Sequence, residues 1–344
     1  MKIIKYIFLL LLLVIIGGAL YIATLNGDYQ VEESQVINAP ASLLYKTVNN
    51  YKTWEEWGPW MDDSDDMIMS YPENTTGVGA GYSWKSEKQG DGEMKTVATV
   101  PNKSLDQKIV FITPMGESKS DIYWRFEPVK EGGTKVVWGM KGKQNFMEKA
   151  FWATQDSTLS QSVKPMYKEG LEKLAANVQK QMDVYSINID GVTEHGGGFY
   201  MYSTVATTMA AIPQKLGQML PAVYQYMQSN NIPINGQPFT MYNNVDENNA
   251  TAIISAALPT RDKVIVPKDG TILCGFMEKQ KMVKTTLKGN YTNLKAAWTK
   301  AMQYIEDNQL EPMGTAAPLE IYANDPQAVP NPADWITEIY IPIK

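Results

Sequence analysis

A carboxylate that breaks an internal repeat is the most informative chemical feature of this sequence. Two segments, YMQSNNI from Tyr226 and YIEDNQL from Tyr304, match each other, and each is followed by a glycine, a proline and a tyrosine at similar spacing. The two copies end on the strand-like runs AIISAALP and WITEIYIP, which place Ser255 opposite Glu338 when aligned on their prolines. A duplicated unit with pseudo-two-fold symmetry forms a cleft between its halves. A carboxylate in only one copy suits an asymmetric or cationic ligand, so Glu338 is the first candidate for a ligand-binding residue.

Aromatic side chains accompany this carboxylate in both copies. Alternation along a strand places Ile336, Glu338 and Tyr340 on one face of the last strand, and aromatic rings could form walls that stack on a planar or cationic ligand. The predicted ligand-binding residues are Glu338, Tyr340, Tyr322, Tyr242, Phe239 and Trp335. Two simpler interpretations stay open. Glu338 could lie on the solvent side of a terminal strand, and the two repeated tyrosines, Tyr242 and Tyr322, could be core residues.

Other kinds of reactive site find little support. The chain has one histidine, His195, and one cysteine, Cys274, so it can form neither a His-based metal cluster nor an intrachain disulfide. No Gly-x-Ser-x-Gly segment is present to supply the nucleophile of a Ser-His-Asp site. The acidic run 62–66 lacks the glycine and the final glutamate of an EF-hand loop. We therefore predict no catalytic residues, no metal and no cofactor.

The charge balance argues against a nucleic-acid partner. A net charge of −6, without a basic cluster or a helix-turn-helix pattern, offers no surface that would neutralise phosphates. With 44% hydrophobic and 20% charged residues, the chain has the composition of a folded globular protein. We expect it to bind no nucleic acid.

The N-terminus predicts a membrane anchor over residues 1–27. Residues 6–25 are uncharged and apolar, and as a helix they would cross a ~30 Å hydrocarbon core. Lys2 and Lys5 precede this run and acidic residues from Asp28 onward follow it, so the positive-inside rule puts the N-terminus in the cytoplasm. A cleaved signal peptide is the alternative, but the run exceeds the usual ~7–15 residues and lacks an A-x-A-like exit. We predict a single-pass protein of the cytoplasmic membrane with extracytoplasmic domains, which would be periplasmic in a Gram-negative cell.

The rest of the chain divides into two α+β domains, at 28–181 and 182–344. In the first, a strand over 29–38 and a short helix precede five strand-like runs separated by turn signals. An apolar stripe at 3-4 spacing over 159–178 predicts a long closing helix. This order predicts a helix-grip fold, in which the long helix crosses the concave face of an antiparallel sheet and leaves a cavity between them.

This domain resembles the START-like superfamily (SRPBCC, polyketide cyclase/dehydratase type). The resemblance is carried by Ala39-Pro40, by the segment Trp54…Trp57-Gly58-Pro59-Trp60 and by Gly170-Leu171 on the last helix. It implies a cavity for a hydrophobic ligand. The three tryptophans could line the entrance to that cavity, or they could fill the junction between helix and sheet.

The second domain is predicted to be the duplication itself. Its copies, about 184–260 and 270–344, each show the pattern of a strand, a helix and two further strands. The helices are expected over 213–229 and 294–305, and Pro221 should kink or split the first of them.

This second domain resembles the gyrase-inhibitor-like (GyrI-like) effector-binding domain of bacterial multidrug-sensing regulators. The matching segments are Gly236-x-Pro238-Phe239, Glu320-Ile321-Tyr322 and the terminal Trp335-x-Thr337-Glu338-Ile339-Tyr340. The resemblance implies a cleft for lipophilic or cationic compounds, with a glutamate on the last strand facing the ligand. Glu338 occupies that position.

These features predict a membrane-anchored protein whose C-terminal cleft binds small lipophilic molecules, cations among them. An enzyme is the less favoured alternative, namely a hydrolase of reactive small-molecule toxins with Glu338 as general base. A third alternative is a stress-linked interaction protein without a ligand. The sequence identifies no protein partner.

Overall fold

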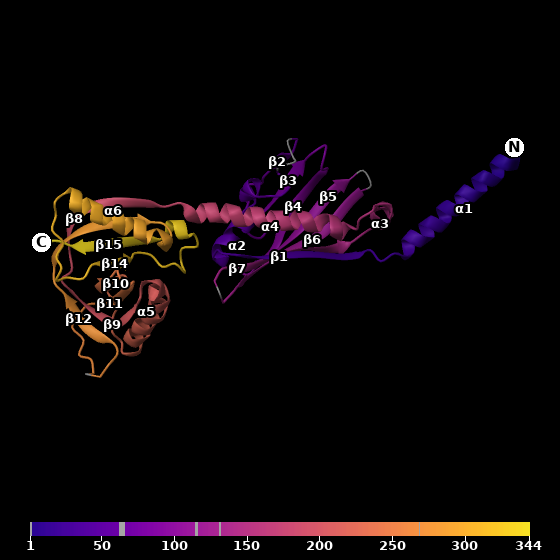
Figure 1. Ribbon diagram of the computed structural model, residues 1–344. Helices are drawn as coiled ribbons and strands as arrows, with labels where there is room; N and C mark the ends of the chain where they lie inside the picture. The colour runs from indigo at the N-terminus through magenta and orange to yellow at the C-terminus, as the bar shows by residue number, and fades with distance from the viewer. Residues whose placement is uncertain (1, 62–65, 114–115, 131, 268) are drawn as a thin grey trace. The chain divides into compact units, whose positions relative to one another are not determined.

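The computed structural model describes residues 2–61, 66–113, 116–130, 132–267 and 269–344 (Figure 1). The chain divides into two compact units, and the boundary falls between Lys180 and Gln181 in the last turn of α4 (Leu159–Asp183). Each unit combines one antiparallel sheet with helices, so the predicted α+β class is confirmed.

The N-terminal helix α1 (Lys2–Thr24) is long and apolar enough to span a membrane, and protein buries none of its apolar stretch. Its large aliphatic side chains stay exposed from Ile3 to Leu20. Because exposed hydrocarbon is unfavourable in water, a bilayer suits this helix. The direction in which it would cross stays a prediction.

The first domain is built on a seven-stranded sheet in the order β1-β7-β6-β5-β4-β3-β2, with every neighbouring pair antiparallel (Figure 1). The strands are β1 (Asp28–Ile37), β2 (Ile68–Ser70), β3 (Gly81–Lys85), β4 (Asp91–Val100), β5 (Ser104–Thr113), β6 (Gly116–Pro128) and β7 (Thr134–Lys143). The helix α2 (Ala41–Asn49) and the 3-10 turn η1 (Tyr51–Glu56) follow β1, while α3 (Phe146–Ala153) and α4 follow β7. The long helix α4 was predicted, but α3 was not.

The helix α4 lies against the inner face of this sheet (Figure 1). Tyr167 of α4 stacks on Trp138 of β7, with 4.0 Å between the ring centroids. Gly170 follows one turn later and has no room for a side chain, because a Cβ there would lie 2.6 Å from the Trp138 ring. Close contact between helix and sheet at this point therefore explains the glycine in the sequence.

The predicted apolar stripe of α4 has two parts. Its later members, Leu171, Leu174 and Val178, are fully buried in the core of the domain. Its earlier members, Leu159, Val163 and Met166, are only partly buried and line a cavity. One helix therefore both closes the core and forms a wall of the cavity.

The tryptophan-rich segment mainly fills the core. Trp54 and Trp57 are buried with their rings 5.0 Å apart, and the indole N–H of Trp54 donates to the Val48 carbonyl at 2.8 Å. Trp60 is half-buried and lines the cavity. The core interpretation is therefore right for the first two tryptophans, whereas the third contributes to the cavity wall.

The second domain is built on an eight-stranded sheet in the order β12-β9-β11-β10-β14-β15-β13-β8. The strands are β8 (Ser186–His195), β9 (Gly198–Thr208), β10 (Phe239–Asp246), β11 (Thr251–Thr260), β12 (Leu273–Met277), β13 (Gln280–Lys288), β14 (Leu319–Tyr322) and β15 (Ile336–Pro342). The order is symmetric about the β10–β14 pair. The predicted strand-helix-strand-strand unit occurs twice, as β9-α5-β10-β11 and as β13-α6-β14-β15, where α5 is Ile212–Ser229 and α6 is Leu294–Asp307. The duplication is confirmed.

The strand registers show which positions in the two copies correspond. Met241 of β10 pairs with Ser255 of β11, and Ile321 of β14 pairs with Glu338 of β15. Ser255 and Glu338 are therefore equivalent, as their alignment in the sequence predicted. By the same registers, Thr240 and Glu320 are also equivalent, and they form a second pair in which the two copies differ.

The helix α5 is continuous through Pro221, so the expected split does not occur. A proline removes the hydrogen bond to the carbonyl four residues earlier, which here belongs to Gly217. Both residues are exposed, so that carbonyl can bond to water instead. Burial of Val223 and Met227 holds the following turns against the sheet.

Candidate functional sites

A cavity of about 430 Å³ lies in the first domain between the sheet and the first half of α4. This volume falls within the ~300–1,000 Å³ that small-molecule sites usually have. Its wall is mostly aromatic and aliphatic, and includes Tyr82, Trp84, Ile109, Phe111, Met140 and Met166. Such a wall favours a ligand that is largely apolar.

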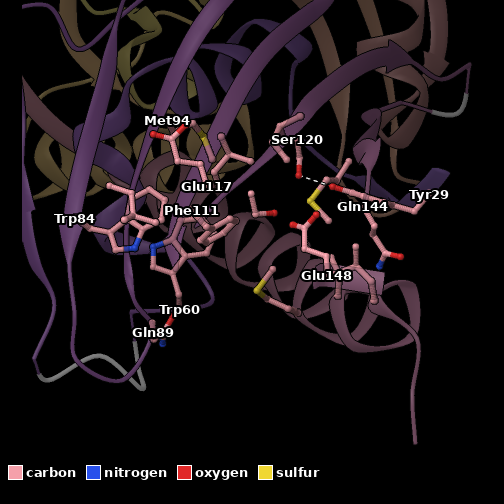
Figure 2. A pocket seen from close by; sticks show the side chains of 18 of the residues that line it. Tyr29, Trp60, Trp84, Gln89, Met94, Phe111, Glu117, Ser120, Gln144 and Glu148 are labelled. Carbon is pink, nitrogen blue, oxygen red and sulfur yellow. Dashed lines mark hydrogen bonds between the residues drawn. The ribbon is translucent and has the colours of Figure 1, made fainter. Parts of the chain in front are cut away.

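Both ends of the cavity carry polar side chains (Figure 2). Tyr29, Gln144 and Glu148 lie at one end, and Gln89 and Glu117 lie with Trp60 and Trp84 at the other. The Tyr29 hydroxyl is 2.6 Å from the hydroxyl oxygen of a serine on β6, and burial raises the pKa of Tyr29, so this phenol keeps its proton. The polar groups at the two ends can therefore orient a ligand whose main part is apolar.

One wall residue has an unmet hydrogen-bonding group. The indole N–H of Trp138 is buried and has no hydrogen-bond partner among the described residues. A buried donor without a partner costs about 1–3 kcal/mol. Because this nitrogen has no exposed surface, a ligand in the cavity does not reach it.

In the second domain, the sheet divides the six predicted ligand-binding residues between its two faces. Ile339 of β15 packs against α6, so its neighbours Glu338 and Tyr340 point away from that helix. Phe239 shares this face, because it belongs to the same buried cluster as Tyr340.

The remaining three residues lie on the helix side. Tyr242 packs against Trp298 of α6 at 5.5 Å, and Tyr322 is 5.7 Å from Tyr291. Trp335 is 4.8 Å from the same Tyr291 ring. The six residues therefore do not form one site.

Glu338 already has a counter-ion. The ammonium of Lys284 on β13 lies 2.8 Å from one carboxylate oxygen, and the Tyr340 hydroxyl donates to the other at 2.9 Å. The Glu338 and Lys284 side chains are 23% and 26% exposed. A cationic ligand at Glu338 would have to displace this lysine, so the carboxylate is neither a free charge nor a plain solvent-facing residue.

Two neighbours of Glu338 keep their neutral forms. Burial raises the pKa of Tyr340 to about 12, helped by its hydrogen bond to Glu338. The ring of His195, at the end of β8, lies 4.3 Å from the Tyr340 ring. Burial lowers the pKa of His195, although the charge of Glu338 acts in the opposite direction.

The carboxylate that sequence reasoning missed as a site residue is Glu320. It is 2% exposed, and it accepts hydrogen bonds from the Trp298 indole at 2.5 Å and from the Tyr322 hydroxyl at 3.2 Å. Burial raises the pKa of Glu320, while hydrogen bonds from Trp298, Tyr242 and Tyr322 oppose the rise. The signal that could have found it is its unequal partner in the other copy, Thr240, which is the kind of asymmetry that singled out Glu338.

The last residue of the acidic run is held by backbone hydrogen bonds. Residues 62–65 lie outside the described part of the chain, and Asp66 accepts hydrogen bonds from the backbone N–H groups of Glu87 at 2.7 Å and Lys88 at 3.1 Å. Within the described ranges, no three His, Cys, Asp or Glu side chains are placed so as to hold a metal ion.

Comparison with known families gives a match for each domain. Residues 28–179 match the family described as polyketide cyclase / dehydrase and lipid transport. Residues 199–344 match the GyrI-like small molecule binding domain. Both resemblances are confirmed, and the chain joins two domain types that bind small molecules. A search of curated proteins finds no match.

Solved structures are similar to parts of the chain. Protein MLL2253 from Mesorhizobium loti is 18% identical, with a TM-score of 0.34, and the match covers 44% of this chain and 98% of that one. The C-terminal domain of EcmrR is also 18% identical, with a TM-score of 0.38 and coverage of 46% and 98%. EcmrR in a complex with DNA is 17% identical, with a TM-score of 0.40 and coverage of 63% and 89%. That this chain binds no nucleic acid stays a prediction.

Proposed function

We propose that this chain, which joins a domain of the polyketide cyclase and lipid-transport type to a GyrI-like domain, is a membrane-anchored protein that binds an apolar small molecule in its N-terminal cavity. The observation that carries the proposal is the cavity of about 430 Å³ with its aromatic and aliphatic wall. Each Å² of apolar surface that a ligand buries there contributes about 25 cal/mol. Polar side chains at its ends, Tyr29 and Gln144 among them, would orient the ligand.

Filling the cavity should abolish this binding. Ile109 is buried on β5 and lines the cavity, so Ile109→Trp places an indole in the space that a ligand needs. The probe is the neutral dye N-phenyl-1-naphthylamine, titrated by fluorescence against residues 28–344. We expect one dye per wild-type chain, and binding weaker by about tenfold or more in the variant, which is about 1.4 kcal/mol.

The matched control is Val97→Trp, an exposed position on β4 that does not line the cavity. It should bind the dye as the wild type does. Thermal melts of all three proteins show whether they remain folded. Equal affinity in folded Ile109→Trp and wild type would contradict the proposal.

A second function is favoured by the surroundings of Glu320, namely the binding of a lipophilic cation by the C-terminal domain. A buried carboxylate is costly unless it is paired, and no lysine or arginine in the described ranges forms an ion pair with Glu320. Trp298 and Tyr322 donate hydrogen bonds to it, and Tyr242 packs against Trp298, so its surroundings in the described part of the chain supply neutral donors and no counter-ion. Glu338 stays a candidate, but Lys284 already matches its charge.

Calorimetric titration of tetraphenylphosphonium distinguishes the contributions of Glu320 and Glu338 to cation binding. Loss of a buried charge partner costs about 2–5 kcal/mol. Glu320→Gln should therefore weaken binding of the cation by that amount and leave the affinity for neutral triphenylphosphine oxide unchanged. Glu338→Gln should cost less, and Ser255→Ala, at the equivalent position in the other copy, should cost nothing.

The reverse order of the two glutamine variants would assign the cation to Glu338. Equal affinity for tetraphenylphosphonium in the wild type and all three variants would contradict cation binding at either carboxylate. A hydrolase would instead show turnover of a reactive electrophile that is lost in a glutamine variant with binding intact.

A further inference from the structure

The short helix α3 presents an apolar surface to its surroundings. It has no buried residue, and Phe146, Met147 and Phe151 are 44%, 47% and 43% exposed. Three large apolar side chains exposed on eight residues are more than scattered surface residues, and such patches mark contact surfaces.

The two charged side chains of α3 are both used within the protein. Glu148 completes a capping box with Asn145, in which each side chain accepts from the other residue's backbone N–H, at 2.6 Å and 2.9 Å. The ammonium of Lys149 donates to the carbonyls of Ala23 at 3.2 Å and Leu25 at 3.0 Å. The exposed surface of α3 is therefore left mainly apolar.

These bonds fix α3 at the end of α1. The backbone N–H of Gln144 donates to the Gly27 carbonyl at 2.8 Å. A side chain at Gly27 would place its Cβ 2.7 Å from the Gln144 carbonyl oxygen, so the contact is close enough to require glycine. Residues 23–27 are where an anchor helix leaves the hydrocarbon, so α3 lies at the level of the membrane surface whenever α1 spans the bilayer.

The same segment forms part of the cavity wall. Gln144, Asn145, Glu148, Phe151 and Trp152 all line the cavity, and Figure 2 shows Gln144 and Glu148 together at its Tyr29 end. One end of the cavity, the exposed apolar helix and the end of the anchor are therefore parts of one connected structure.

We propose that α3 rests in the surface of the bilayer beside the anchor and opens the cavity toward the lipids, so that the ligand is a membrane lipid that enters by its acyl chain. The bilayer is favoured over a protein partner because α3 is hydrogen-bonded to the anchor itself, and because phenylalanine and tryptophan suit the boundary between headgroups and acyl chains. This proposal rests on the proposed function, since it needs the same cavity and the same anchor.

The first test locates α3 relative to lipid. The full chain, with Cys274→Ser to remove its only cysteine, carries a nitrobenzoxadiazole dye on Met147→Cys and is reconstituted into phosphatidylcholine vesicles that contain doxyl-labelled phosphatidylcholine. The control dye is on Val100→Cys, an exposed position at the β4–β5 turn, where no residue lines the cavity. The dye at 147 should lose most of its emission to the quencher, and the dye at 100 should keep it. Equal quenching at the two positions would overturn the proposal.

The second test identifies the source of the ligand. Native mass spectrometry of the full chain released from phosphatidylcholine vesicles should show one bound lipid on the wild type and none on Ile109→Trp. Wild type without lipid would overturn the lipid assignment, and if the naphthylamine dye still binds, the proposed function survives as a site for a free apolar molecule. If the naphthylamine dye does not bind but the label at position 147 is quenched, the proposed function is contradicted and the docking of α3 on the bilayer is still supported.

Discussion

Glu320 and Glu338 are two carboxylates of one sheet in opposite surroundings. Glu338 is partly exposed and has a lysine within 2.8 Å, so its charge is matched inside the protein. Glu320 is buried among aromatic side chains whose neutral donors bond to it. Because desolvation disfavours the charged form of an acid, the two residues have different chemistry despite their identical side chains.

Burial of Glu320 predicts a pH-dependent stability. Its pKa is raised in the folded state, so the unfolded chain releases this proton first as pH rises above ~4.3. The contribution of the Glu320 proton to the free energy of unfolding is therefore complete below that pH. It is lost as pH rises through the folded pKa, by up to about 1.4 kcal/mol for each pKa unit between the folded and unfolded states. Glu320→Gln lacks this term, so its stability relative to wild type should increase from pH 4 toward neutral pH.

Urea unfolding of residues 181–344 at several pH values measures this difference. Glu306→Gln, which removes an exposed carboxylate on α6, is the control and should follow the wild type. A Glu320→Gln difference that stays constant with pH would contradict the raised pKa.

At the scale of elements, the periodic spacing of apolar residues predicted most of the fold, because this spacing repeats over many residues in strands and long amphipathic helices. Alternation along β15 correctly separated Glu338 and Tyr340 from Ile339. It could not place Tyr242 and Tyr322 on the other face, because that depends on how β10, β14 and β15 pair across the sheet. The six predicted ligand-binding residues lie on two faces of the sheet for that reason.

A cavity was predicted from the order of elements, but its extent and the helix α3 were harder to predict. The apolar stripe of α4 has the same period where it fills the core and where it lines the cavity, so sequence does not reveal how far helix and sheet separate. The eight residues of α3 are too few for a clear period. Its one local signal was the capping box of Asn145 and Glu148.

At the scale of the whole molecule, each unit has its own sheet and its own buried core. A domain with a complete core can fold alone. We therefore expect residues 28–180 and 181–344, expressed separately, each to unfold cooperatively on heating. If neither shows a cooperative transition in calorimetry, the division into two independent domains is wrong.

The most direct measurement is a titration of N-phenyl-1-naphthylamine against the two separated domains. The cavity of about 430 Å³ lies wholly within the first domain. Residues 28–180 should therefore bind one dye with the affinity of residues 28–344, and residues 181–344 should bind it weaker by about tenfold or more. Binding that follows residues 181–344 alone, or that is absent from a folded first domain, would contradict a ligand site between the sheet and α4.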